Sequence, residues 1–343
     1  MEVGILGATG NVGQRFVQLL EGHPWFDVGD LTASASSAGA PYEEAADWRL
    51  ETPLPDDVAG IEVGETEPSS VSDDVDLVFS ALPSSVARDV EPAFAEAGYL
   101  VASNAGWARM EDDVPLLIPE INPDHIGLLE VQRDERGWSG GIVKNPNCSA
   151  ITMTPTLAAL SDFGLSDVTV ATLQAVSGAG YTGVTSMEII DNVLPYIGKE
   201  EGKMETEPQK ILGDFDGATV RSADIDISAT CNRVATIDGH LENLWCGFED
   251  AVDPADAEEA LRDLGGHDLP SAPDDVIVVR DEDDRPQPRL DRMAGDGMSI
   301  VVGRVRDDGD GVKFSCLAHN TIRGAAGASL LNAELLADEL GLR

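Results

Sequence analysis

The chain has 343 residues, 42% of them hydrophobic, and its 63 acidic and 22 basic side chains give a formal net charge of −41. This size and apolar content predict a globular protein of two domains, and no apolar run approaches the roughly 20 residues that a membrane-spanning helix needs. A surface with this charge repels phosphate, which excludes nucleic acids and anionic membranes as partners.

The acidic composition has two interpretations. High net charge is typical of disordered chains, but the hydrophobic content argues against disorder. We therefore interpret the carboxylate-rich surface as suited to very high salt, where screening removes the self-repulsion. The four cysteines are irregularly spaced and match neither a disulfide framework nor a C-x-x-C metal pattern. With no signal peptide before the first strand, the sequence predicts a cytoplasmic protein without a metal site.

Residues 1–20 have the pattern of a nucleotide-binding unit. A buried strand is expected at 2–6, followed by a glycine-rich turn at 7–13 and an amphipathic helix. In this context Gly7 allows a tight turn, Gly10 lets a pyrophosphate approach the backbone, and Gly13 lets the helix pack on the strand. The spacing G-x-x-G-x-x-G is a variant of the dinucleotide fingerprint, for which a purely structural turn is the alternative.

The next strand, near 28–33, ends at a loop rich in serine and glycine, 34–39. An NAD-selective site places Asp or Glu near that strand end to bind the ribose 2′-hydroxyl, and this loop has neither. Small hydroxyl groups, such as those of Ser34 and Ser37, tolerate a 2′-phosphate instead. The loop therefore predicts NADP as the cofactor, with an ordinary Ser/Gly loop as the alternative.

Strands at 75–81 and 99–103, with a helix at 90–97 between them, predict a parallel, doubly wound sheet. Ligands of such sheets bind beyond the carboxyl ends of the strands. Four polar residues lie just past these ends, namely Ser84, Ser103, Asn104 and Arg109. The guanidinium of Arg109 could clamp a phosphate or carboxylate with two hydrogen bonds, or form a surface ion pair with a neighbouring carboxylate.

A single cysteine follows a rigid Asn-Pro-Asn turn at 145–147, and the apolar spacing after it predicts a helix that Asn147 caps. Cys148 would then lie in the first helical turn, among unpaired backbone N–H groups and at the positive end of the helix dipole. Both favour the thiolate, which is the form that attacks a carbonyl carbon. A small buried core cysteine is the alternative.

Beyond Cys148 the pattern changes to alternating strands typical of an antiparallel sheet, first at 166–176. The turn Ser177-Gly178-Ala179-Gly180 follows this strand and could approach a ligand closely. Residues 184–212 predict helix in pieces. Glu207 and Lys210 share one helical face there, where a solvated ion pair is the alternative to a site.

Residues 225–240 predict strand, and the turn before His240 could bring it back towards Arg233. Histidine is scarce in this chain, and His240 could be the proton shuttle for a thiol or a structural residue. The chain continues with an acidic helix at 251–262 and strands within 274–311. An apolar helix after Asn320 is expected to pack back on the nucleotide domain.

Together these stretches resemble aspartate-β-semialdehyde dehydrogenases of the archaeal and fungal type over nearly the whole chain. The motifs that carry the resemblance are the glycine-rich turn at 7–13, Ser103-Asn104-Ala105, Asn145-Pro146-Asn147-Cys148-Ser149, residues 174–180, Glu207-x-x-Lys210, Arg233-x6-His240, and residues 320–327. The resemblance implies a Rossmann-type parallel-sheet domain, 1–147, completed by the C-terminal helix, 320–343. It also implies an α+β catalytic and dimerisation domain, 148–319, with a mainly antiparallel sheet.

The resemblance also implies a role for each candidate residue. Cys148 would be the nucleophile, His240 the acid/base and Gln174 a residue that orients the substrate. The substrate would be held by Asn104, Arg109, Glu207, Lys210 and Arg233. NADP would contact Gly7, Thr9, Gly10, Asn11, Val12, Ser34, Ser37, Ser84, Ser177, Gly178 and Asn320.

The implied reaction is the NADPH-dependent reduction of L-aspartyl-4-phosphate to L-aspartate 4-semialdehyde and phosphate through a Cys148 thioester. It would serve lysine, threonine and methionine biosynthesis, in a homodimer or homotetramer. Relatives of this type often carry Arg and Lys at the positions of Ser36 and Ala40, so use of NAD is left open. The alternatives are a malonyl-CoA reductase or an N-acetylglutamyl-phosphate reductase, which share the thioester chemistry, and a non-catalytic NADP-binding regulator.

Overall fold

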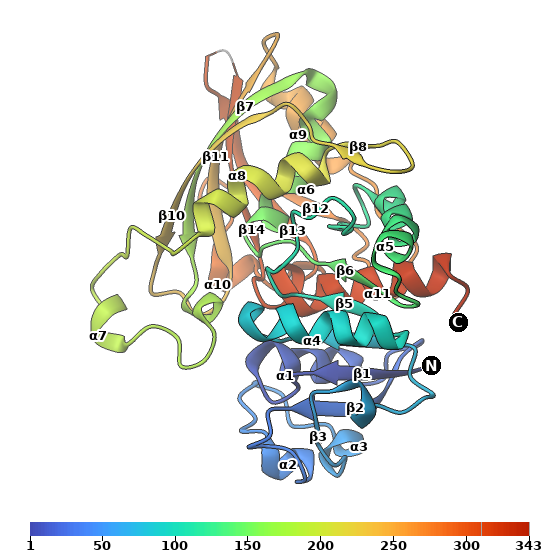
Figure 1. Cartoon of the computed structure of the whole chain (residues 1–343). Helices are drawn as coiled ribbons and strands as arrows, with labels where there is room; N and C mark the ends of the chain where they lie inside the picture. The colour runs from blue at the N-terminus through green and yellow to red at the C-terminus, as the bar shows by residue number, and fades with distance from the viewer. Residues whose placement is uncertain (310, 343) are drawn as a thin grey trace.

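The computed structural model describes residues 1–309 and 311–342 and contains two six-stranded sheets (Figure 1). The strands of the first sheet are all parallel, in the order β3-β2-β1-β4-β5-β6. They are β1 (Glu2–Leu6), β2 (Asp27–Ala33), β3 (Gly64–Glu65), β4 (Leu77–Ser80), β5 (Leu100–Ser103) and β6 (Gly141–Lys144). This is the doubly wound sheet that the sequence predicts, and its order reverses beside β1, where such sheets bind ligands.

The helices of the structure are α1 (Asn11–Leu20), α2 (Tyr42–Ala45), α3 (Asp56–Ala59), α4 (Ser84–Ala97), α5 (Leu128–Arg136), α6 (Ala150–Leu160), α7 (Ser186–Ile189), α8 (Glu200–Ile211), α9 (Pro254–Arg262), α10 (Pro288–Asp291) and α11 (Gly327–Glu339). Shorter helical turns are η1 (Pro68–Ser70), η2 (Pro123–Gly127), η3 (Ser161–Phe163), η4 (Val176–Ala179), η5 (Ala294–Gly297) and η6 (Ile322–Ala326). No helix in the described part of the chain is both long and apolar enough to cross a membrane.

Apolar side chains fill both faces of the first sheet, because alternate residues of each buried strand point to opposite faces. On one face Phe79 of β4 packs with Phe16 of α1 and Leu331 of α11. On the other face Val78 packs with Phe94 of α4. The C-terminal helix therefore belongs to this core, as the sequence predicts.

The second sheet has the order β10-β7-β11-β14-β13-β12. Its strands are β7 (Leu165–Gln174), β10 (Asp226–Arg233), β11 (His240–Phe248), β12 (Ile277–Arg280), β13 (Ile300–Asp307) and β14 (Gly311–Ala318), and a separate antiparallel pair is formed by β8 (Asp214–Phe215) and β9 (Val220–Arg221). The three central pairings are antiparallel, whereas each edge strand is parallel to its neighbour. The sheet is thus mixed and mostly antiparallel.

Helices α6, α8 and α9 lie on one side of the second sheet (Figure 1). Met153 and Leu157 of α6 pack with Leu244 of β11 and Phe314 of β14 in a core separate from that of the first sheet. Because the two cores divide the chain near the start of α6, we propose the division suggested by the sequence, 1–147 with 320–343 and 148–319.

Some elements differ from their predicted bounds. The helix expected at 90–97 begins earlier, at Ser84. Strands β3 and β6 and helix α5 are not predicted from the sequence. β3 has only two residues, which show no pattern, and α5 is mostly polar apart from one narrow buried face.

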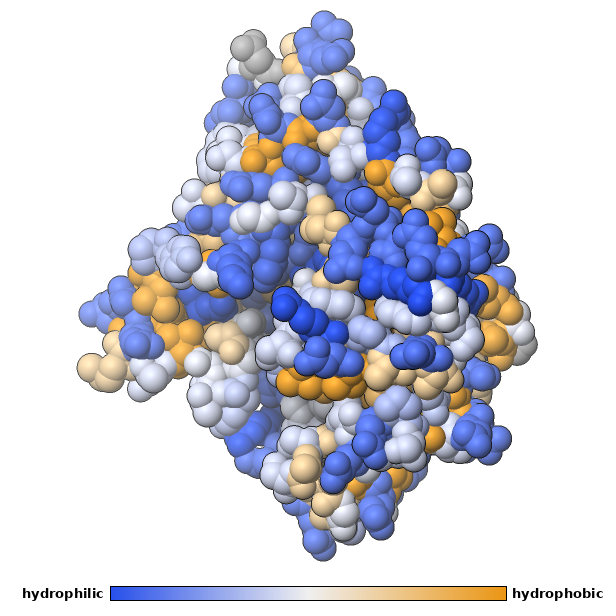
Figure 2. All heavy atoms as spheres, in the orientation of Figure 1, coloured by the Kyte–Doolittle hydropathy of each residue, from blue (hydrophilic) through white to orange (hydrophobic). Residues whose placement is uncertain are grey.

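A lobe formed by residues 181–199, which includes α7, projects from the second domain (Figure 1). It carries several exposed apolar side chains, and Figure 2 shows such side chains at the left edge of an otherwise largely hydrophilic face. The exposed apolar residues of the lobe are Tyr181, Met187, Ile190, Val193 and Tyr196. Apolar surface of this kind is typical of a contact between protein chains.

Candidate active site

Strand β6 leads directly into the turn that carries Cys148, so this residue lies at the carboxyl edge of the first sheet and at the start of α6. The side-chain oxygen of Asn147 accepts hydrogen bonds from the N–H groups of Ser149 and Ala150 at 3.0 and 3.2 Å. This is the capping contact expected of Asn147, although regular helix begins only at Ala150. Cys148 is only partly buried, whereas the other three cysteines are buried.

His240 is the first residue of β11, and its Nε2 lies 3.3 Å from Sγ of Cys148. Its other ring nitrogen, Nδ1, accepts the N–H of Ala175 at 3.1 Å. The neutral ring therefore carries its proton on Nε2, directed at the sulfur. An imidazolium would place a second N–H against that of Ala175. This contact limits the acid/base role predicted for His240 and favours hydrogen-bond donation to the sulfur.

The sulfur and the ring are both held in their uncharged forms. Burial, followed by the carboxylate of Glu200, raises the pKa of the Cys148 thiol to about 12. Burial also lowers the pKa of His240 to about 3. Lost hydration and a nearby negative charge therefore act against the preference for a thiolate that the helix start provides. A thiolate here requires a further positive charge beside the sulfur.

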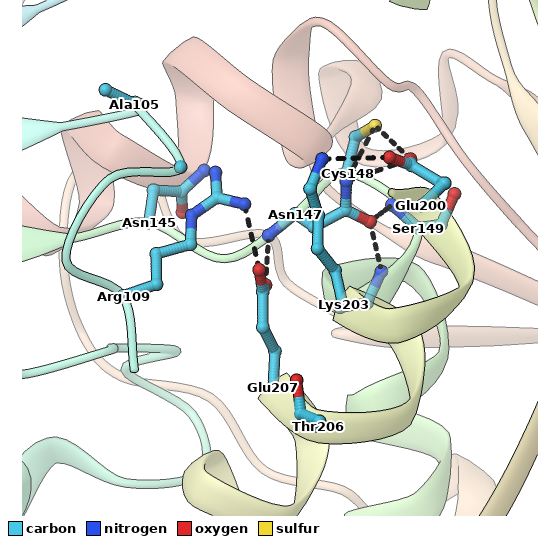
Figure 3. Close-up of polar contacts among 12 residues, drawn as sticks. Ala105, Arg109, Asn145, Asn147, Cys148, Ser149, Glu200, Lys203, Thr206 and Glu207 are labelled. Atoms are coloured by element: carbon cyan, nitrogen blue, oxygen red, sulfur yellow. Dashed lines mark hydrogen bonds and ion pairs between the residues drawn. The ribbon is translucent and has the colours of Figure 1, made fainter. Parts of the chain in front are cut away.

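Glu200 and Lys203, in the first turn of α8, lie beside the sulfur (Figure 3). Oε1 of Glu200 is 3.9 Å from Sγ and accepts the side-chain N–H of Asn147 at 2.9 Å. Its Oε2 accepts from Nζ of Lys203 at 3.0 Å. The sequence prediction missed this pair, which has the same i, i+3 spacing as Glu207 and Lys210 two helical turns later. Spacing alone could not decide which pair faces the cysteine.

Glu207 is buried and joins two parts of the site (Figure 3). Its Oε1 accepts from Nη1 of Arg109 at 3.0 Å, and its Oε2 accepts the backbone N–H of Asn147 at 2.6 Å. Arg109 also donates to the carbonyl oxygen of Asn104 at 2.8 Å, while its Nε is buried without a partner. Glu207 therefore positions Arg109 and the nucleophile's turn, and both of its oxygens are already occupied.

Lys210 does not face the site. Its Nζ donates to the carbonyl oxygens of Arg109, Glu111 and Val114 at 3.0, 2.6 and 2.8 Å. These three bonds use all the donors of an ammonium group, and burial lowers its pKa to about 8. The structure contradicts the predicted contact of Lys210 with the substrate.

A cavity of about 990 Å³ lies beside Cys148, between the carboxyl edge of the first sheet and the second domain. Eight of the predicted site residues line it together with the cysteine: Asn11, Val12, Ser84, Asn104, Arg109, Ser177, Gly178 and Asn320. Three further cations line it that the sequence prediction did not include, namely Arg88, Lys199 and Lys203. In so acidic a chain, this gathering of basic groups indicates a site for anions.

The other predicted cofactor residues lie farther along the same edge of the sheet. Gly7, Thr9 and Gly10 form the turn after β1, and Ser34 and Ser37 follow the neighbouring strand β2. None of these five is among the residues that line the cavity. They lie along the edge of the sheet farther from Cys148, where the adenosine half of a dinucleotide would bind.

The glycine-rich turn has the geometry of a phosphate cradle. Gly7 has a φ of +78°, and a Cβ on Gly13 would lie only 2.3 Å from the carbonyl oxygen of Gly7. Helix α1 begins at Asn11, directly after Gly10, and no side chain caps its first N–H groups. Free N–H groups at the positive end of a helix bind phosphate. The turn therefore fits the pyrophosphate of a dinucleotide.

Gln174 and Arg233 end the paired parallel strands β7 and β10, so both reach the edge of the second sheet where His240 lies. Nε2 of Gln174 is buried without a partner, and Nη1 of Arg233 donates to the carbonyl oxygen of Ala175 at 2.5 Å. A Cβ on Gly178 would lie 3.2 Å from both Nη1 of Arg233 and Nε2 of His240. The turn at 177–180 therefore packs closely against Arg233 and His240.

Asn320 connects the C-terminal segment to the same turn. Its Nδ2 donates to Oγ of Ser177, and its Oδ1 accepts the N–H of Gly239, each at 2.8 Å. The structure thus brings Cys148, His240 and this turn to one place between the two domains.

Both halves of the chain match known family models. Residues 2–129 match the semialdehyde dehydrogenase NAD binding domain, and residues 157–323 match the semialdehyde dehydrogenase dimerisation domain. The chain is 55% identical to an aspartate-semialdehyde dehydrogenase of Archaeoglobus fulgidus over 98% of each sequence. It belongs to the aspartate-semialdehyde dehydrogenase family. This confirms the family resemblance predicted from the motifs.

Solved structures of the family agree. The Candida albicans aspartate-semialdehyde dehydrogenase, solved with NADP, is 42% identical and superposes with a TM-score of 0.88 over 98% of each chain. Aspartate-semialdehyde dehydrogenase II of Vibrio cholerae, solved with ASA, is 27% identical with a TM-score of 0.79, again over 98% of each chain. A malonyl CoA reductase (NADP) of Metallosphaera sedula is 39% identical over 99% of this chain and 97% of its own. The alternative of a malonyl-CoA reductase is therefore not favoured.

Proposed function

We propose that this chain catalyses the NADPH-dependent reduction of L-aspartyl-4-phosphate to L-aspartate 4-semialdehyde and phosphate, through a thioester on Cys148. The observation that carries the proposal is the 3.3 Å contact between Sγ of Cys148 and Nε2 of His240, beside a cavity of about 990 Å³ lined by cations. A silent NADP-binding regulator would need no such pair of nucleophile and hydrogen-bond donor.

The cofactor is NADP, and its place is supported by the uncapped start of α1 and the cradle of Gly7, Gly10 and Gly13. Asn11, Val12 and the turn at 177–178 connect that cradle to the cysteine. When bound, NADPH supplies the hydride that reduces the thioester. Ser36 and Ala40 carry no positive charge that would favour the 2′-phosphate of NADP over NAD, so use of NAD stays open.

The substrate carries a carboxylate, a phosphate and an amino group, and the site offers a side chain of opposite charge for each of these three groups. Arg109, Lys203 and Arg233 lie near enough to the sulfur to interact with its charge, and they are available for the anionic groups. Asn104 and Gln174 each keep a buried amide nitrogen without a partner. We assign the carboxylate of Glu200, rather than Glu207, to the amino group, because Glu200 is the one beside the sulfur.

Substrate binding would then activate the nucleophile. Glu200 raises the pKa of the Cys148 thiol in the free protein, and an ammonium paired with Glu200 would remove that effect. The N–H on Nε2 of His240 would stabilise the sulfur as a thiolate when the sulfur attacks the acyl carbon. After hydride addition to the thioester carbon, the C–S bond of the resulting thiohemiacetal would break to give the aldehyde, and the same N–H would stabilise the released thiolate until it takes a proton from solvent. In the first step the C–O bond of the acyl phosphate breaks as the C–S bond forms, and the thiol proton leaves with the departing phosphate.

The decisive assay is phosphate-dependent reduction of NADP with aspartate semialdehyde in molar salt. Activity is expected, and Cys148→Ala should abolish it while NADPH binding, measured by fluorescence, is retained. Normal turnover by Cys148→Ala would refute the thioester. Faster reduction of malonyl-CoA than of β-aspartyl phosphate would assign the chain to a sister enzyme.

The dimerisation domain indicates a homo-oligomer. We propose a homodimer or homotetramer, supported by the exposed Met187 and Tyr196 of the lobe, 89% and 68% accessible. We also propose a role in lysine, threonine and methionine biosynthesis. A cytoplasmic location is supported by the four free cysteines. A requirement for high salt is supported by the net charge of −41.

A further inference from the structure

A second cleft, of about 500 Å³, lies on the far side of the turn at 177–180 from Cys148. Helix α1 forms one wall, the loop at 49–52 another, and segments 180–183 and 237–238 with Arg292 and Met293 the rest. Of the predicted cofactor residues, Asn11 and Ser177 line this cleft, whereas Thr9, Ser34 and Ser37 do not, nor does Cys148. The proposed reaction makes no use of it.

Two arginines face this cleft without a carboxylate partner. Nη1 of Arg15 donates to the side-chain oxygen of Gln18 at 2.7 Å, and its Nε is buried with no partner. Arg292 has a single long hydrogen bond, of 3.3 Å, to the carbonyl oxygen of Asp238. Among the described residues neither guanidinium forms an ion pair, although acidic side chains outnumber basic ones 63 to 22. Burial lowers the pKa of Arg15, which marks it as a partly desolvated cation.

Other charged groups in the cleft are Glu51, Asp238, Arg49 and His319. Arg49 is already paired with Asp47, and burial lowers the pKa of His319 to about 4, so that this ring is uncharged at neutral pH. Glu51 and Asp238 act on Arg15 only at longer range, against the effect of burial. Room for an anion therefore remains beside Arg15 and Arg292.

Part of the lining of the cleft is apolar. Ile237, Met293 and Tyr181 line it, and the ring of Tyr181 stacks on the guanidinium of Arg49 with 3.5 Å between the guanidinium carbon and the ring centroid. Small-molecule sites have this composition, with apolar walls and a few placed polar groups. Arginine binds phosphate and carboxylate through paired N–H groups.

We propose that this cleft binds a small organic anion, a phosphate or carboxylate on an apolar or aromatic body, at a site that adjoins those of substrate and cofactor. Arg15 and Arg292 hold the anionic group, and Tyr181, Ile237 and Met293 contact the apolar body. Asn11 and Ser177 line both this cleft and the catalytic cavity. Occupation of the cleft therefore alters the affinity of the enzyme for NADPH.

The test is calorimetric titration of the NADPH-saturated enzyme with phenyl phosphate and, separately, with benzoate, at one fixed salt concentration. Saturation with NADPH keeps both probes out of the cofactor site, and the two probes distinguish a phosphate-bearing from a carboxylate-bearing ligand. Arg15→Gln/Arg292→Gln should weaken the binding of the preferred probe roughly 10- to 100-fold, as expected for loss of charge-assisted hydrogen bonds. In the wild type the same probe should change KM for NADPH severalfold.

The matched control is Arg289→Gln/Arg306→Gln, which removes two exposed guanidinium groups outside the cleft and should leave probe affinity within about twofold. The proposal is overturned if neither probe binds the wild type at millimolar concentration. Equal affinity of the wild type and Arg15→Gln/Arg292→Gln would also overturn it, because the probe would then bind elsewhere. An equal loss in the control variant would show a general charge effect instead of a site.

Discussion

The ammonium of Lys144 and the carboxylate of Glu91 form an ion pair in which neither side chain is accessible to solvent. Oγ of Ser103 donates to Glu91 and accepts from Lys144, and Ser80 donates to the same carboxylate. This network joins the ends of β4, β5 and β6 to α4. Because Asn145 directly follows Lys144, the network holds in place the point at which the turn that carries Cys148 begins.

Breaking this pair from one side should destabilise the protein. Glu91→Leu or Lys144→Met alone leaves a buried, uncompensated charge and should lower the free energy of unfolding by about 3–5 kcal/mol. The double variant removes both charges and should recover most of that loss, measured by urea denaturation in constant salt. If the double variant is as unstable as the sum of the single ones, the two groups are not energetically coupled.

Glu200→Gln should make the thiol of Cys148 more acidic. Burial raises the pKa of this thiol and the carboxylate of Glu200 raises it further, so removal of that carboxylate lowers the pKa and moves the rise of the alkylation rate to lower pH. The measurement is the rate of iodoacetamide labelling of Cys148 against pH, without substrate.

The matched control for this experiment is Glu201→Gln in the same helical turn, which should not move the profile. A Glu200→Gln profile that coincides with the wild type would show that the carboxylate does not act on the sulfur.

Substitution of Lys203 should impair catalysis, whereas substitution of Lys210 should impair stability. Lys203→Met removes a cation at the cavity and should raise KM or lower kcat/KM by roughly 10- to 100-fold with little change in Tm. Lys210→Met leaves three carbonyl groups without donors and should lower the free energy of unfolding by about 3 kcal/mol or more. Thermal denaturation and steady-state kinetics of both variants decide the assignment. If Lys210→Met impaired catalysis and Lys203→Met impaired only stability, Lys210 would be the residue that contacts the substrate.

Gly178→Ala should impair catalysis without unfolding the protein. Its Cβ would lie 3.2 Å from Nη1 of Arg233 and Nε2 of His240, so one of these groups must shift. We expect kcat to fall about tenfold or more, because small misplacements at a reacting centre have large effects. The neighbouring Gly180 has nothing within 4 Å of an added Cβ, but its φ of +74° disfavours alanine there. The control is therefore Ser177→Ala, which tests loss of the Asn320 contact without adding bulk.

Salt should stabilise the fold. The net charge of −41 produces self-repulsion that ions screen, so Tm should rise between about 0.1 and about 1 M salt. Differential scanning calorimetry in KCl and in NaCl provides the measurement, and the two salts should agree if screening is the cause. A Tm independent of salt would contradict the interpretation of the surface as one suited to high salt.

The sequence by itself determined the parallel sheet, the glycine-rich turn, the cap at Asn147 and the family, because each depends on residues close together in the chain. It also identified Cys148 and His240, although it placed them together only through the family resemblance. The structure brings them to 3.3 Å through the pairing of β11 with β7 and the approach of α6.

Only the tertiary structure decided between Glu200-x-x-Lys203 and Glu207-x-x-Lys210. The two pairs have the same spacing on one helix face, and which turn of α8 meets the cysteine depends on how that helix packs against α6 within the second domain. The causes that raise the pKa of Cys148 and lower that of His240 also come from tertiary contacts, chiefly burial. A helix start favours a thiolate locally, but burial and the carboxylate of Glu200 oppose that preference, and neither can be read from neighbouring residues.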